Sequence, residues 1–166
     1  AHCVHSREAE LALLKERGVF IAHSPESNSN LASGVAPVRR FLEQGLRVGL
    51  ASDVAGGSSL NLFRAMAHAI QASKLRWQLL DQSLPPLTFD QVFWMATLGG
   101  GSFFGPVGTF AQGYAFDALV IHMDDIEGLE RTPFEKLQQF IYDGDDRNIK
   151  ARYCAGELLD EGIWEK

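Results

Sequence analysis

The stretch RVGLASDVAGGSS, residues 47–59, decides the fold, because an apolar strand ends there at an acidic residue and a loop of glycine and serine. A helical pattern follows from about Leu60 to Leu75. Short apolar strands that alternate with amphipathic helices predict an α/β fold with a parallel sheet. In such folds the loops after the strands carry the chemically active side chains.

Two similar units precede this stretch. AHCV, residues 1–4, is expected to be the end of a strand, with Ser6 capping the helix that follows. VFIAH, residues 19–23, predicts the next strand, and the polar loop 24–34 separates it from a helix over residues 36–44. We therefore expect three consecutive strand–helix units whose strands stand side by side.

The pattern changes after the Leu84-Pro85-Pro86 break. Thr88 is expected to cap a helix that begins at FDQVFWMATL. Further along, residues 118–122 predict a strand, NIKARYCAGELL predicts a short hairpin around Ala155-Gly156, and PFEKLQQFI between them predicts a small helix. The second part of the chain is thus expected to be mainly β.

Composition excludes several classes of protein. The chain has 166 residues, whereas a complete α/β barrel takes about 250. A net charge of −6 without a Lys/Arg cluster offers no surface for nucleic acid or an anionic membrane, and no apolar run approaches the roughly 20 residues of a membrane span. Two cysteines at opposite ends form no disulfide framework, so a cytoplasmic setting is expected. The first residues read as the tail of a strand, and we expect further chain upstream.

Three polar residues fall at expected strand ends: His2, His23 and Asp53. Imidazole and carboxylate are zinc ligands, and a catalytic zinc site takes about three protein ligands plus water. From the residues alone, a structural reading stays open. A histidine at a strand end is more often a hydrogen-bonded structural residue, and an aspartate before two glycines often only makes a turn.

The remaining candidates are weaker. His5 would point away from the position of His2, and His68 and His122 fall on an expected helix and strand, where a structural role is expected. Gly56-Gly57 would let backbone approach a ligand, but a simple turn explains the pair equally well.

Six motifs that follow one another along the chain resemble successive blocks of the guanine deaminases, zinc-dependent enzymes of the amidohydrolase superfamily. The SNSNLASG loop and the DGDDRNI stretch are most similar to guanine deaminases rather than to the wider superfamily. In order, the blocks are AHCVH, IAHSPESNSNLASG, VGLASDVAGGSS, ATLGGGSFFG, GTFAQGYAFDALVI, and YDGDDRN with the following YCAGELL.

The resemblance implies the C-terminal part of a TIM-like (β/α)8 metal-dependent hydrolase barrel. Residues 1–109 would be its last three βα units, and residues 110–166 a terminal β segment with a short helix that returns to a small β domain. His2 would end the sixth strand and hydrogen-bond the substrate or the water on zinc. Asp53 would end the eighth strand, bind zinc and take the proton of the attacking water. The implied reaction is hydrolytic deamination of guanine to xanthine and ammonia.

Some features depart from the family pattern. His23 matches a position that need not be histidine, so it is expected to be structural or to line the site. HSP stands for the usual HCP, ASDVAGG for GTDVAGG, and Tyr114 replaces a lysine. The family's HxH pair, its fifth-strand histidine and its catalytic glutamate are not in this sequence. The chain by itself is therefore expected to bind zinc poorly and to be inactive.

Two classes of function remain open. The chain belongs either to an enzyme whose other part supplies the missing ligands, or to a non-catalytic truncated assembly module. Within the enzyme class, the alternative substrates are another purine, a pterin or an aminotriazine. The expected partners are Zn²⁺, a small purine and, in the complete protein, a second copy in a homodimer.

Overall fold

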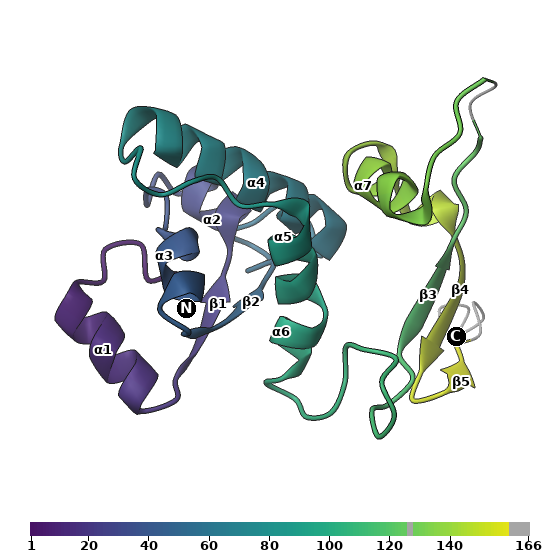
Figure 1. Cartoon of the computed structure of the whole chain (residues 1–166), viewed down its shortest axis with the longest axis horizontal. Coiled ribbons are helices and arrows are strands. Elements are labelled where there is room, and N and C mark those ends of the chain that lie inside the picture. The colour runs from purple at the N-terminus through teal and green to yellow at the C-terminus, as the bar shows by residue number, and fades with distance from the viewer. Residues whose placement is uncertain (126–127, 160–166) are drawn as a thin grey trace.

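The computed structural model describes residues 1–125 and 128–159. Figure 1 shows helices gathered around a pair of parallel strands in the first part of the chain, and a second sheet with its own helix in the last part. The helices are α1 (Glu8–Glu16), α2 (Pro25–Asn30), α3 (Val38–Glu43), α4 (Leu62–Leu79), α5 (Phe89–Ala96), α6 (Leu98–Gly101) and α7 (Pro133–Asp143), with a 3-10 turn at Asp146–Asn148. The strands are β1 (Phe20–His23), β2 (Arg47–Leu50), β3 (Ala118–Ile121), β4 (Ile149–Cys154) and β5 (Glu157–Leu158).

The parallel pair β1 and β2 positions the candidate site. Phe20 pairs with Arg47 and His23 with Leu50, so both strands end at the same edge of the sheet. The ladder continues one step further, because Ala51 N–H donates to the His23 carbonyl at 2.9 Å. The loops that follow the two strands therefore begin side by side.

The first expected strand, residues 1–4, is wrong. His2 and Cys3 have φ values of 65° and 52°, which belong to the left-handed region and cannot continue an extended strand. A single ladder-like hydrogen bond remains, from His2 N–H to the Ala22 carbonyl at 2.9 Å. It still places His2 beside the last part of β1.

Two local expectations about helices are also corrected. Arg7, not Ser6, is the N-cap of α1, and its backbone N–H donates to Glu10 Oε2 at 2.7 Å. The segment 24–34, expected to be an irregular loop, contains α2. Pro25 stands in the first turn of α2, where a missing N–H is tolerated, and Leu31 N–H closes the last turn on the Ser27 carbonyl at 3.0 Å.

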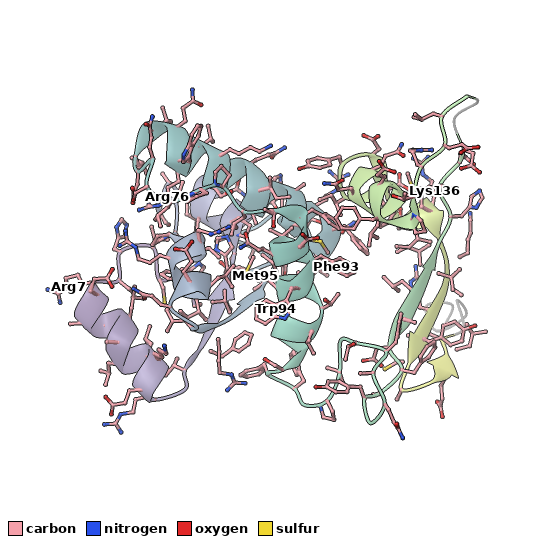
Figure 2. All side chains as sticks on the ribbon, in the orientation of Figure 1. Arg7, Arg76, Phe93, Trp94, Met95 and Lys136 are labelled. Carbon is pink, nitrogen blue, oxygen red and sulfur yellow. The ribbon has the colours of Figure 1, made fainter. Side chains whose placement is uncertain are left out.

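The core lies between β1, β2 and the helices that cover them. Ile21, Val48 and Phe41 are fully buried there. Helix α5 adds Met95, which Figure 2 shows on the side of the helix facing the two strands, with Phe93 on the opposite side. This packing explains why the short strands are nearly all apolar.

The second sheet confirms the expected β character of the last part. β3, β4 and β5 are antiparallel, and Ala155 and Gly156, with φ values of 51° and 87°, form the tight turn of the β4–β5 hairpin. Helix α7 joins this part to α4, since the rings of Phe63 and Phe140 meet edge to face at 4.6 Å. The expected strand end at His122 falls one residue short, at Ile121.

A largely apolar cavity of about 1170 Å³ separates the two parts of the molecule. Phe20, Leu50 and Phe93 line it from the first part, and Leu119 and Tyr153 from the second. Within residues 1–125 and 128–159, no helix combines the length and the apolarity that a membrane crossing would require.

Candidate functional site

His2 and Asp53 come together at the edge where β1 and β2 end. His2 Nε2 lies 3.7 Å from Asp53 Oδ2, and the two side chains are 37% and 42% exposed. Their positions follow from the sheet, because His2 hydrogen-bonds to β1 and Asp53 follows β2 by three residues. Both remain accessible to a small molecule.

The loop after β2 holds Asp53 in an uncommon conformation. Its φ of 48° is left-handed, which costs a non-glycine residue about 1–2 kcal/mol. The Asp53 carbonyl accepts hydrogen bonds from Gly56 N–H at 3.0 Å and from Gly57 N–H at 2.7 Å, so the two glycines close a turn around it. The local structure is therefore built to direct the carboxylate.

Helix α2 supplies two site residues that the sequence interpretation missed. Ser27 Oγ–H donates to Asp53 Oδ2 at 2.5 Å, and His2 Nδ1 lies 2.9 Å from Asn28 Oδ1. Ser27 and Asn28 are 1% and 3% exposed. The run SNSN gave no sign of which of its residues are buried, since Ser29 and Asn30 are exposed, and only its resemblance to the guanine deaminase motif singled it out.

His23 lies at the end of β1 and is 2% exposed. Burial and, to a smaller extent, the nearby His2 together lower its pKa from 6.5 to about 4. The ring is therefore neutral at pH 7. Within the described residues its Nδ1 has no hydrogen-bond partner, and neither has Asn28 Nδ2.

The other histidines lie outside this group. His5 Nε2 donates to the Ser33 carbonyl at 2.9 Å, which ties the start of the chain to the segment after α2. His68 Nδ1 lies 3.8 Å from Glu26, and His122 Nε2 lies 3.3 Å from Asp124 on the surface. The structural role expected for His68 and His122 stays a prediction.

The described residues make at most part of a metal site. Asp53 offers a half-exposed carboxylate, and zinc accepts carboxylate ligands. No group of three or more His, Cys, Asp or Glu side chains lies close enough to hold a metal ion in the part of the chain that the structure describes. A catalytic zinc site takes about three protein ligands, so this chain would supply only a share of them.

Chemically, the pair combines a carboxylate with an imidazole. The carboxylate can accept a proton or bind a cation, and His2 can donate or accept a hydrogen bond through Nε2. Such a pair is suited to proton transfer around a small polar substrate.

Comparisons with known proteins give this site a context. The amidohydrolase family model matches residues 1–159. Over 96% of its length the chain is 34% identical to guanine deaminase of Dictyostelium discoideum and 37% identical to that of Mus musculus. It is also 30% identical, over 97% of its length, to the 5-methylthioadenosine/S-adenosylhomocysteine deaminase of Syntrophomonas wolfei, of which it covers 37%.

Solved structures show the same relationship. The crystal structure of guanine deaminase from C. acetobutylicum with guanine in its active site matches 96% of this chain with a TM-score of 0.90 and 46% identity. A zinc-bound adenosine deaminase from Xanthomonas campestris matches 95% with a TM-score of 0.76 and 28% identity, and the chain covers 35% of it.

The chain spans 37% of the length of the two guanine deaminase relatives and 38% of the solved guanine deaminase. The match nevertheless extends over almost the whole of this chain, in sequence and in fold. The chain belongs to the amidohydrolase family, with an α/β structure similar to that of guanine deaminases.

Proposed function

We propose that the protein carrying this chain is a zinc-dependent aminohydrolase that converts guanine and water to xanthine and ammonia. The similarity to the guanine-bound guanine deaminase carries the proposal, with a TM-score of 0.90 and 46% identity. The meeting of His2 and Asp53 at one sheet edge supports it, because the reaction needs a proton acceptor and a polar group beside the attacked carbon.

In this proposal residues 1–109 are part of a (β/α)8 barrel, and residues 110–166, of which 160–166 lie outside the described residues, lead out of it to a terminal β segment. Parallel β1 and β2, which end at one edge, support the barrel assignment. The antiparallel sheet β3–β5 supports a separate terminal segment. The start of this chain already reaches the outer edge of β1, through His2 N–H and the Ala22 carbonyl, and the outer edge of β2 would pair with a strand from the rest of the protein.

Asp53 would be one ligand of the metal and the acceptor of the proton released by the attacking water. Zinc, when bound, supplies a positive charge that lowers the pKa of a water molecule towards about 7. His2 would accept a hydrogen bond at Nε2 from the attacking water or the substrate, and, once protonated there, would stabilise negative charge that develops beside C2 of guanine. The protons taken up by the ring nitrogen and the departing amine would come from groups outside this chain.

A second candidate is deamination of an adenine-type nucleoside, and the similarity to the 5-methylthioadenosine/S-adenosylhomocysteine deaminase favours it over a pterin or an aminotriazine. The two reactions attack different ring carbons, so the groups that orient the ring must differ. A non-catalytic assembly role would leave the His2–Asp53 arrangement without use.

Ammonia release from a panel of substrates tests the proposal. The intact protein, loaded with zinc, would be given guanine, 5-methylthioadenosine, adenosine, a pterin and an aminotriazine at equal concentrations. We expect guanine to have the highest kcat/KM, by about a hundredfold or more, because a ring held by buried polar groups discriminates strongly. A higher kcat/KM for another compound would show that this compound, and not guanine, is the substrate. If no compound released ammonia, the enzyme assignment would be overturned.

We further propose a cytoplasmic location and a homodimer for the complete protein. Both cysteines of the described chain are free, which suits a reducing compartment. Size-exclusion chromatography with light scattering on the intact protein would give the dimer mass directly.

A further inference from the structure

The short helix α2 lies directly against the Asp53 loop. Besides Ser27, which binds the Asp53 carboxylate, Glu26 accepts a hydrogen bond from Ser58 Oγ, and Asn30 Nδ2 donates to the Gly56 carbonyl at 3.0 Å. Three side chains from one helix thus hold three points of a single loop. These three hydrogen bonds tie α2 to the loop that carries Asp53.

The approach is close enough to exclude any side chain at Gly56. A Cβ there would lie 2.5 Å from Ser27 Oγ and 2.9 Å from Asp53 Oδ2. Because Ser27 is 1% exposed, its hydroxyl cannot swing into solvent to make room. Glycine at position 56 therefore leaves room for the hydrogen bond between Ser27 and the Asp53 carboxylate.

The hydrogen bond from Ser27 engages one of the two oxygens of the Asp53 carboxylate. Ser27 donates a hydrogen bond to Asp53 Oδ2, the same oxygen that lies 3.7 Å from His2 Nε2. This hydrogen bond restricts the rotation of the carboxylate. Oδ1 makes no side-chain hydrogen bond within the described residues.

Asn28 acts on the second site residue. With Oδ1 at 2.9 Å from His2 Nδ1, the ring donates through Nδ1, and in the neutral ring Nε2 carries the lone pair. The contact is buried on the Asn28 side, which is 3% exposed, so water competes weakly for the ring. The orientation and the tautomer of His2 are thereby set by α2.

We propose that α2 is a positioning element for the site: Ser27 orients the carboxylate of Asp53, and Asn28 fixes the orientation and tautomer of His2. The proposal rests on the proposed function for its kinetic consequence only. The contacts that carry it are independent of which ring is deaminated. In characterised metalloenzymes, mutation of a residue that hydrogen-bonds to a metal ligand lowers metal affinity or activity by about 10- to 100-fold.

Ser27→Ala tests the first contact in the intact, zinc-loaded protein. Ser29→Ala is the matched control, because Ser29 lies on the same helix and donates to the Pro25 carbonyl at 3.0 Å, a backbone contact within α2 itself. We expect Ser27→Ala to lower kcat about 10- to 100-fold with KM changed by less than about threefold, and Ser29→Ala to leave both unchanged. Equal losses in the two variants, or none in Ser27→Ala, would overturn the role of Ser27.

Hydrogen exchange gives a readout that does not depend on activity. The amides of Gly56 and Gly57 bond to the Asp53 carbonyl, so they report how firmly the loop is held. Ser27→Ala should speed their exchange by about three- to tenfold, the loss of one hydrogen bond, and Ser29→Ala should not. Unchanged exchange in Ser27→Ala would contradict the proposal even if guanine proves not to be the substrate.

Asn28→Leu tests the second contact, since leucine fills a similar volume without the amide. Nitrogen-15 spectra of the His2 ring would be recorded for the wild type and the variant in the metal-free protein. We expect the wild type to show one Nδ1–H tautomer and the variant a mixture dominated by Nε2–H. The same tautomer in both proteins would remove Asn28 from the proposal.

Discussion

Burial controls the charge of His23, which ends β1 and lies near His2. A group whose folded pKa lies below its unfolded value favours the folded state when it is deprotonated. For His23 the folded pKa is about 4 against 6.5 unfolded. Its contribution to the free energy of unfolding is therefore fully present above about pH 6.5 and is lost as the pH falls towards 4.

We predict that His23→Asn flattens this part of the pH dependence. Between pH 7 and pH 4 the wild type should lose about 2–3 kcal/mol more unfolding free energy than the variant, since each unit of pKa shift is worth about 1.4 kcal/mol. Urea unfolding of both proteins at several pH values gives the difference directly. Parallel curves would contradict the lowered pKa of His23 in the folded state.

At the same scale, the sequence could place His2 and Asp53 but not their partners. Asp53 follows the end of β2 as the strand pattern predicts, whereas His2 reaches the same edge without a strand of its own, through its N–H bond to the Ala22 carbonyl, and lies 3.7 Å from Asp53. Ser27 and Asn28 could not be placed, because serine and asparagine favour loops over helices and the segment reads as irregular. Tertiary contacts to Asp53 and His2 stabilise α2 instead.

At the scale of elements, β2 and α6 approach each other through glycine. A Cβ on Gly49 would lie 2.8 Å from Gly100 Cα and 2.7 Å from the Phe20 ring. We predict that Gly49→Ala destabilises the fold by about 1–3 kcal/mol, because the backbone of α6 must move away from the strand. Denaturant unfolding of the variant measures the loss.

A double variant separates the two contacts. In a Phe20→Leu background the ring is gone and only the Gly100 backbone resists, so Gly49→Ala should cost less than it does in the wild type. An equal cost in both backgrounds would show that the ring contact plays no part.

The elements themselves were largely predictable where their patterns are strong. The apolar runs of β1, β2 and β3 and the hairpin at Ala155-Gly156 match their expected positions within a few residues. The first strand was wrong because four residues of apolar character do not determine backbone conformation, and His2 and Cys3 turn instead. Capping by Ser6 failed for a similar reason, since Arg7 and Glu10 form the cap.

At the scale of the whole molecule, the parallel sheet has only two strands in the described structure, so its edges offer unpaired backbone groups, apart from the Ala22 carbonyl that His2 N–H reaches. Beside the sheet lies the cavity of about 1170 Å³ with Phe20, Leu50 and Phe93 on its wall. Open edges and apolar surface both favour association.

We predict that the 166-residue chain, expressed alone, self-associates. Light scattering should give a mass above the 18.3 kDa of one chain, and hydrogen exchange should show weak protection at β1 and β2. A strongly protected monomer would contradict the proposal that these strands form part of a larger barrel.

Asp53 carries the central claim, that this sheet edge is part of a metal-dependent deaminase site. The most direct measurement is the rate of xanthine formation from guanine by the intact protein, zinc-loaded, with Asp53→Ala compared with the wild type. We predict a fall of about a thousandfold or more, because the variant loses a metal ligand and a proton acceptor together. Wild-type turnover in Asp53→Ala would contradict the account.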